Sequence, residues 1–222
     1  MIDLVDSLVR GVIESGVING SGAEVNFDPP TKEWSARRST PTVNVYLYDI
    51  REESNRRAAG VVESRDDAGQ VTRRRVPIRY FRLSYLLTAW TQRPEDEHRL
   101  LSALLSQFMR TPYFPPEAAG EPFASTGLPI MVNVGIPPND ERQVPEIWAS
   151  LGRELKPSID LRVVMPFDPQ IDLPFGPPVT EQPAFSISAP QVGVESEVVR
   201  GRDSSDEDQE GGAGRRGLER MV

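Results

Sequence analysis

Hydrophobic side chains at the start of the chain recur every three or four residues. With residues 2–17 placed on a helix at about 100° per residue, the apolar side chains fill one half of the wheel and the polar ones the other. Asp3 and Asp6 lie near the N-terminus of this helix, where the helix dipole favours acids, and Gly16 is suited to its end. The pattern predicts an amphipathic helix that packs on a core; the alternative is a helix that also meets a neighbouring subunit.

A second helical stripe begins at Pro94, which is followed by three acidic residues typical of a first turn. It is predicted to run to about Arg110, and a shorter helix is predicted over residues 145–151, closed by Gly152. The apolar stripe of the second helix consists of Leu100, Leu101, Leu104, Leu105, Phe108 and Met109.

Strict alternation of apolar and polar residues marks four longer strands. They cover residues 41–50, 76–90, 129–136 and 158–165, and residues 24–27 form a shorter strand. In the third strand, Ile130, Val132, Val134 and Ile136 are expected to point inward. These segments predict one α+β domain with a mixed, mostly antiparallel sheet of about four main strands and helices packed on one face.

The connection between the first two long strands, residues 51–75, is longer than a compact domain usually needs. Two valine-containing segments flank the turn sequence Asp66-Asp67-Ala68-Gly69. We therefore predict a β-hairpin arm that projects from the sheet.

The whole chain has 222 residues and 21 prolines, and its proline and charged residues suggest where it divides. Residues 1–168 are predicted to form the α+β domain. Residues 169–200, in which isolated hydrophobic residues stand among prolines, are predicted to be an extended arm, and the charged residues 201–222 a disordered tail.

The sequence offers little material for catalysis. It has no cysteine, and His98 is its only histidine, which excludes thiolate sites and any site that needs two imidazoles. His98 stands at the start of the second helix with no nucleophile predicted near it, and we interpret it as a packing or capping residue. We expect no enzyme activity, no cofactor and no metal site.

The formal charge of −8 argues against a dedicated nucleic-acid partner, because phosphate binding needs a basic field. No apolar run reaches the roughly 18 residues of a membrane span. The N-terminus also lacks the pattern of a secretory signal, so a cytoplasmic protein without a membrane partner is expected.

Arginines cluster in and beside the predicted hairpin, together with five acids. Arginine makes planar, multi-donor contacts, so a subunit or partner surface is favoured, and a solvated face or a nucleic-acid site is the alternative. The candidate interface residues are Arg51, Arg56, Arg57, Arg65, Arg73, Arg74 and Arg75.

The order of several segments resembles one known family. These segments are VNVYLY at residues 43–48, LSYLLTAW at 83–90, EDEHRLLSALL at 95–105, IWASLG at 147–152 and KPSIDLRV at 156–163. In this succession, over about residues 2–168, the chain is similar to the tube-cap, or tail-terminator, proteins of phage-tail-like contractile injection systems.

The resemblance implies structural work. Such a protein forms a ring, here expected to be a homo-hexamer, on the far end of the inner tube, where it ends polymerisation and anchors the last sheath ring. Its partners would be itself, the inner tube protein and the sheath protein, in a particle that is assembled in the cytoplasm and can be released. The alternatives are an assembly chaperone or adaptor that does not remain in the particle, and an enzyme.

Overall fold

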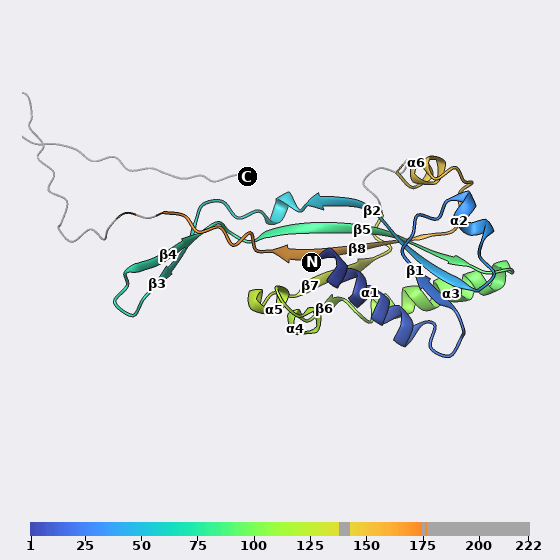
Figure 1. Ribbon diagram of the computed structural model, residues 1–222, viewed down its shortest axis with the longest axis horizontal. Helices are drawn as coiled ribbons and strands as arrows, with labels where there is room; N and C mark the ends of the chain where they lie inside the picture. Colours follow the sequence, from blue (N-terminus) through green and yellow to red (C-terminus); the bar gives the residue numbers. More distant parts are fainter. Residues whose placement is uncertain (138–142, 175, 177–222) are drawn as a thin grey trace, which may run out of the picture. The chain divides into compact units, whose positions relative to one another are not determined.

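A curled mixed sheet of six strands forms the centre of the computed structural model, which describes residues 1–137, 143–174 and 176 (Figure 1). The strand order is β1-β2-β5-β8-β7-β6. The strands are β1 (Glu24–Asn26), β2 (Thr42–Glu52), β5 (Arg79–Trp90), β6 (Tyr113–Phe114), β7 (Ile130–Val134) and β8 (Ile159–Phe167). Only β1 and β2 are parallel, so the predicted α+β class with a mostly antiparallel sheet is confirmed.

The predicted count of four main strands misses β6 at one edge of the sheet. This strand is only two residues long, too short for an alternating pattern to identify. The stretch predicted as a loop before Leu128 also contains the short helices α4 (Pro116–Ala119) and α5 (Phe123–Thr126). Their buried Pro116, Ala119 and Phe123 close one end of the core.

The long helices α1 (Ile2–Gly16) and α3 (Pro94–Met109) pack on the same face of the sheet. Val5, Val9 and Ile13 of α1 and Leu104 and Phe108 of α3 are buried there. Alternate residues of β5 and β8 complete this core, as the predicted strand faces require: Leu83, Tyr85, Leu87, Ile159, Leu161, Val163 and Met165.

Two further helices lie on the opposite side of the sheet from α1 and α3, so the prediction of helices on one face is correct only for the long ones (Figure 1). These are α2 (Lys32–Ala36), which was not predicted, and α6 (Gln143–Ser150). Each contributes a tryptophan to Trp90 of β5: the ring centroids of Trp34 and Trp148 lie 5.4 Å and 6.4 Å from that of Trp90.

A β-bulge in β2 changes which residues face the helices. Leu47 pairs with Tyr85 and Asp49 with Ser84, so Tyr48 is the extra residue. A bulge reverses the alternation beyond it, and Ile50 therefore lies opposite the inward-facing Leu83. Ile50 remains 49% exposed, because the helix-covered part of this face ends before it.

The prediction that Ile136 points inward is wrong. Strand β7 ends at Val134, Gly135 has φ of 68°, and Ile136 is 40% exposed. A positive φ turns the chain out of the extended conformation, so alternation cannot be continued past Gly135.

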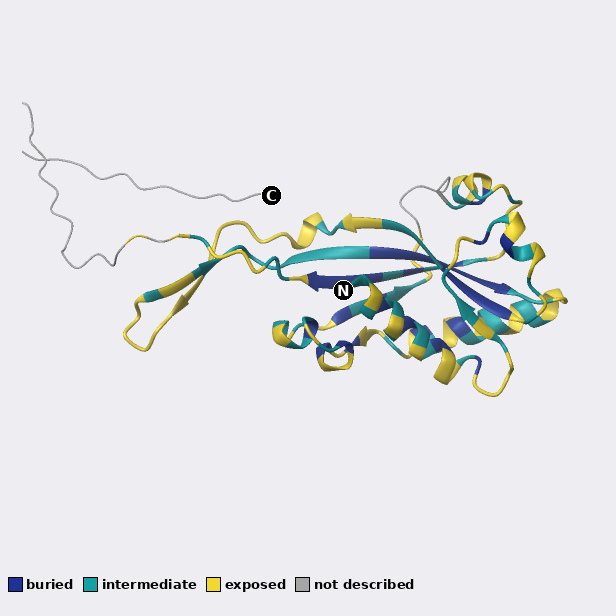
Figure 2. Ribbon diagram, viewed as in Figure 1, coloured by how far each residue is buried: buried dark blue, intermediate teal, exposed yellow. Residues whose placement is uncertain are grey.

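The region after β2 contains the 3-10 helix η1 (Ser54–Arg56) and a separate two-stranded sheet formed by β3 (Val62–Arg65) and β4 (Val71–Arg75). At its turn, the Asp66 carboxylate accepts hydrogen bonds from the amides of Ala68 and Gln70, and Gly69 has φ of 78°. Every residue from Ser54 to Gln70 is exposed (Figure 2).

The chain beyond β8 returns along this hairpin. The Val76 amide donates to the Ile171 carbonyl at 3.0 Å, the Leu173 amide donates to the Arg74 carbonyl at 2.8 Å, and Asp172 forms a bridge with Arg75. The start of the predicted arm 169–200 thus adds a third chain segment to the hairpin. The rest of that arm, apart from Gly176, and the predicted tail 201–222 lie outside the described residues.

Leu161 tests the packing of the helices on the sheet, because it is fully buried between β5, β7 and the helices. We expect Leu161→Ala to lower the free energy of unfolding by about 2–5 kcal/mol, since it leaves a cavity in the core. Urea denaturation measures this change. Leu155→Ala removes the same atoms at a site that is 66% exposed and is expected to change stability by less than about 0.5 kcal/mol; equal losses in both variants would contradict the assigned core.

Candidate interaction surfaces

The predicted arginine cluster is largely neutralised by acids of the same chain. Arg51 lies 2.9 Å from Asp49, Arg57 3.1 Å from Glu52, and Arg65 and Arg74 2.5 Å and 2.9 Å from Glu63. These pairs are partly exposed, so each contributes at most about 1 kcal/mol to stability. The cluster is a compensated surface and not a basic field.

Arg73 and Arg75 hold the returning chain. Arg73 donates two hydrogen bonds to the Asp172 carboxylate, at 2.7 Å and 2.9 Å, and Arg75 lies 3.5 Å from Asp168. The hydrogen bonds from Arg73 lower the pKa of Asp172 and raise that of Arg73. The sequence could not reveal this role, because Arg73 and Asp172 are 99 residues apart.

Arg56 uses its guanidinium differently from the other members of the cluster. It lies over the ring of Tyr80, 4.3 Å from the centroid. This contact orders the η1 segment against β5 and gives Arg56 a structural task within the chain.

A second cluster of cations surrounds the tryptophans at the far end of β5. Arg153 and Lys156 each lie 4.8 Å from the centroid of Trp90, and Arg38 lies 4.6 Å from that of Trp34. Lys156 also pairs with Glu97 of α3. The cations and the tryptophan rings, of which Trp34 and Trp148 are buried, together connect α2, α3 and the loop after α6.

A partly buried polar cluster on the same face consists of Tyr48, which donates to Asp160 at 2.7 Å, and Arg162, which donates to the other oxygen of that carboxylate. Burial and the neighbouring Asp160 raise the pKa of Tyr48 well above its usual value. On the helix side, Tyr85 donates to Asp6 at 2.7 Å, and burial raises the pKa of both groups. Both pairs contain a stably protonated phenol and serve as fixed hydrogen bonds.

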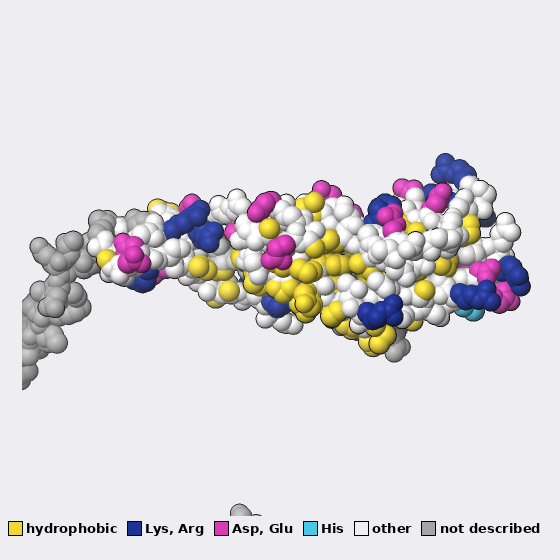
Figure 3. Space-filling view, turned by 90° about the horizontal axis from the view of Figure 1, so that it is seen from below, with side chains coloured by type: hydrophobic (Ala, Val, Ile, Leu, Met, Phe, Trp, Pro, Cys, Tyr) yellow, Lys and Arg dark blue, Asp and Glu magenta, His cyan; other side chains and the backbone are white. Residues whose placement is uncertain are grey.

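Part of the predicted stripe on α3 faces solvent. Leu105 is 38% exposed and Met109 73% exposed, while Leu104 and Phe108 cover the sheet. Apolar side chains also gather in the middle of the molecular face seen from below in Figure 3. The sequence does not reveal this exposure, because the apolar arc of α3 is wider than the part of the helix that contacts the sheet.

The interpretation of His98 as a packing or capping residue is wrong: it is exposed on α3, and the N-cap of this helix is Arg93, with no side-chain capping hydrogen bond. Its backbone carbonyl accepts a hydrogen bond from the Ser102 hydroxyl. Within residues 1–137, 143–174 and 176, no three His, Asp or Glu side chains are grouped as metal ligands would be. The same residues contain no helix that is long and apolar enough to cross a membrane.

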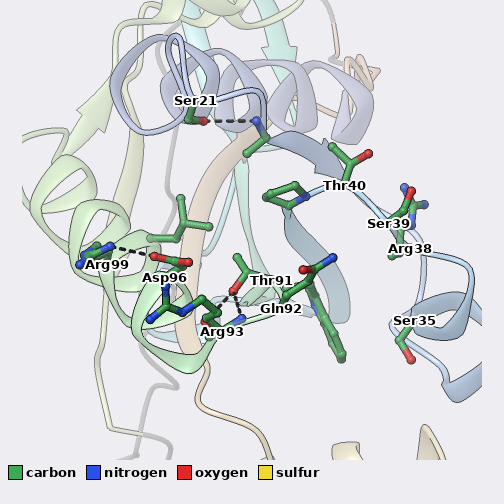
Figure 4. A pocket seen from close by; sticks show the side chains of 14 residues that line it. Ser21, Ser35, Arg38, Ser39, Thr40, Thr91, Gln92, Arg93, Asp96 and Arg99 are labelled. Carbon is green, nitrogen blue, oxygen red and sulfur yellow. Dashed lines mark hydrogen bonds and ion pairs between the residues drawn. The ribbon is translucent and has the colours of Figure 1, made fainter.

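A groove lies at the end of β5 that carries Trp90. It has a volume of about 630 Å³ and lies between the loop after α1, the loop before β2 and the first turns of α3 (Figure 4). Its charged lining residues are Arg38, Arg93, Asp96 and Arg99. No motif in the sequence indicates this groove, because its walls come from three separate segments.

The chain matches the model of a known family. The model of the Pvc16 N-terminal domain matches residues 4–181. The chain belongs to this family. The match includes the whole sheet and every helix except the first two residues of α1, and it extends past the predicted boundary at residue 168.

Two solved structures share the fold of this Pvc16 N-terminal domain. One is the sheath/tube terminator of PVC, an extracellular contractile injection system, in its extended state, with a TM-score of 0.60 and 20% identity over 86% of this chain and 65% of that chain. The other is the tube-terminating cap of the anti-feeding prophage, with a TM-score of 0.58 and 18% identity over 84% of this chain and 61% of that chain. This chain thus spans less than two thirds of either relative, and no curated protein matches it.

The contact between Arg73 and Asp172 predicts a measurable coupling in this domain. We expect Asp172→Asn to remove the charge that Arg73 grips, so that the segment 171–173 separates more readily from β4. Hydrogen exchange should then accelerate at the Val76 and Leu173 amides, which bond across this contact.

Asp67→Asn is the matched control, since it removes the same charge from the turn of the hairpin, away from residues 171–173. Unchanged exchange in Asp172→Asn, or equal acceleration in both variants, would show that Arg73 does not hold the segment.

Proposed function

We propose that this chain is the terminator of a contractile injection particle: it forms a ring on the end of the inner tube, ends polymerisation of tube and sheath, and anchors the last sheath ring. The observation that carries the proposal is the Pvc16 N-terminal domain match over residues 4–181. The likeness of the fold to two proteins described as tube or sheath/tube terminators supports it. Inner tube protein and sheath protein are then its partners, and the ring is a homo-hexamer.

Termination makes a physical demand that this molecule can meet. Tube subunits stack by repeating one head-to-tail contact, so a cap must copy that contact on one face and lack it on the other. A closed ring also needs different, complementary surfaces on the two sides of each subunit. The exposed hairpin and the exposed part of α3 are two distinct surfaces of this molecule that such contacts can use.

The particle is assembled in the cytoplasm and released with the terminator attached, in this proposal. The protein acts by its contacts and has no catalytic step. A role in contacts alone is supported by the arginine cluster, in which the charged side chains form ion pairs that stabilise the surface.

Electron microscopy of particles produced without this gene tests the function. We expect tubes of uncontrolled length or loose sheaths, and we expect particles from the complete gene set to carry six copies of the protein at one end. Normal but empty particles would contradict termination and favour an adaptor or chaperone.

The arginine cluster remains a proposed partner surface, and Arg51 and Arg57 test it best because they are 64% and 52% exposed. We expect Arg51→Ala with Arg57→Ala to reduce the protein's attachment to particles several-fold while changing the free energy of unfolding by no more than about 1–2 kcal/mol, the scale of two exposed pairs. Co-sedimentation with particles measures the attachment.

Lys32→Ala is the control for this pair, since Lys32 is an exposed cation on α2, away from the hairpin, and does not line the groove. Full attachment of the double variant would remove Arg51 and Arg57 from the partner surface. Arg73 and Arg75 are poorer probes, because their replacement also releases residues 168–173.

A further inference from the structure

The groove at the Trp90 end of β5 combines cationic and hydroxyl groups with apolar side chains, which suits a short acidic turn. It is bordered by Arg38, Arg93 and Arg99 against a single acid, Asp96. Hydroxyl groups of Ser21, Ser35, Ser39, Thr40 and Thr91 also line it, and the apolar part of its wall consists of Ala23, Pro41, Trp90 and Leu100 (Figure 4). Its volume of about 630 Å³ is within the range of pockets that hold a drug-sized ligand, which is room for the tip of a tight turn.

The arginines of the groove differ in how firmly they are held. Arg99 donates to Asp96 at 2.8 Å, but its side chain is 78% exposed. Arg93 is 74% exposed and lies 3.8 Å from Glu95, the longest of the ion pairs between described side chains. The Arg38 guanidinium lies 3.5 Å from the Glu24 carboxylate and 3.7 Å from that of Asp28. Arg93 in particular has donors available for another carboxylate.

The turn of the β3–β4 hairpin is a protruding acidic segment of matching character. The Asp66 carboxylate accepts hydrogen bonds from the amides of Ala68 and Gln70, which fixes the shape of the turn. Arg65 pairs with Glu63 and donates to the Gly69 carbonyl, so its charge is compensated within the hairpin. Asp67 is exposed, and its carboxylate takes part in no ion pair with any described side chain.

The hairpin and the groove belong to opposite ends of β5. The hairpin joins this strand just before Arg79, and Trp90 at the other end lines the groove. A strand rises about 3.3 Å per residue, so the 12 residues of β5 separate the two sites by roughly 40 Å. The hairpin is held at the Arg79 end by the segment 171–173, and its turn therefore does not occupy the groove of its own chain.

We propose that the turn Asp66-Asp67-Ala68-Gly69 of one copy docks in the groove of the next copy, with Asp67 facing Arg93 and Arg99. The occupant is a second copy because both halves of the contact are on every chain but at opposite ends of one strand. Such a contact is head-to-tail, and it closes into a ring when the rotation from one copy to the next completes a full turn. The inference rests on the proposed ring and names the surfaces that join its subunits.

The absence of cysteine in the chain permits a direct test. Ala68→Cys places a thiol on the turn, and Ser39→Cys places one at the groove. A short bismaleimide is applied to the double variant, as isolated full-length protein and in purified particles. We expect a ladder of covalent multimers from the double variant, and a covalent dimer when the two single variants are mixed.

Ala68→Cys combined with Ser150→Cys is the matched control, because Ser150 is exposed on α6 and does not line the groove. No ladder in either preparation, or an equal ladder from the control pair, overturns the proposal. A crosslink confined to the monomer also overturns it, because the turn would then reach the groove of its own chain.

A charge exchange tests the assigned pair without a crosslinking residue at the contact. We expect Asp67→Arg to reduce ring formation roughly fivefold, the scale of a partly exposed ion pair, and Arg93→Asp in the same chain to restore it. Native mass spectrometry measures the rings. Failure of the exchange, while particles still carry sealed tubes and rings, removes this contact and leaves the terminator function intact; unaltered tubes in the gene deletion remove the function itself.

Discussion

The structure depends on burying strand β5, which has to be covered differently along its length. Its first four residues are partly exposed, and the next seven, Leu83–Ala89, are buried on both faces of the sheet. Helices α1 and α3 cover one face, while the tryptophans of α2 and α6 cover the end of the other. The strand is thus a core element at one end and a support for the hairpin at the other.

The core and the long helices could be predicted from the sequence because their information is local. Alternation in β5 and β8, and the spacing of Val5, Val9 and Ile13, each lie within one segment. The bulge at Tyr48 could not be predicted, since it is defined by pairing with Ser84. The same holds for α2, whose five residues carry only Trp34 as a buried anchor.

The candidate surfaces were predicted less well, for a related reason. The arginines were visible in the sequence, but their partners Asp172 and Asp168 lie almost a hundred residues further along the chain. Without those pairs, Arg73 and Arg75 read as free donors for a partner. The groove depends on Arg38, Arg93 and the loop after α1 coming together, which only the folded chain specifies.

A two-stranded hairpin on its own is marginally stable in water. Here residues 171–173 add backbone pairing to β4, with two arginines gripping Asp172 and Asp168. The stability of the hairpin therefore depends on the path that the chain takes after β8. A chain that ended directly after β8 would keep its core but lose the segment that supports β3 and β4. The hairpin thus requires residues that follow it by about a hundred positions.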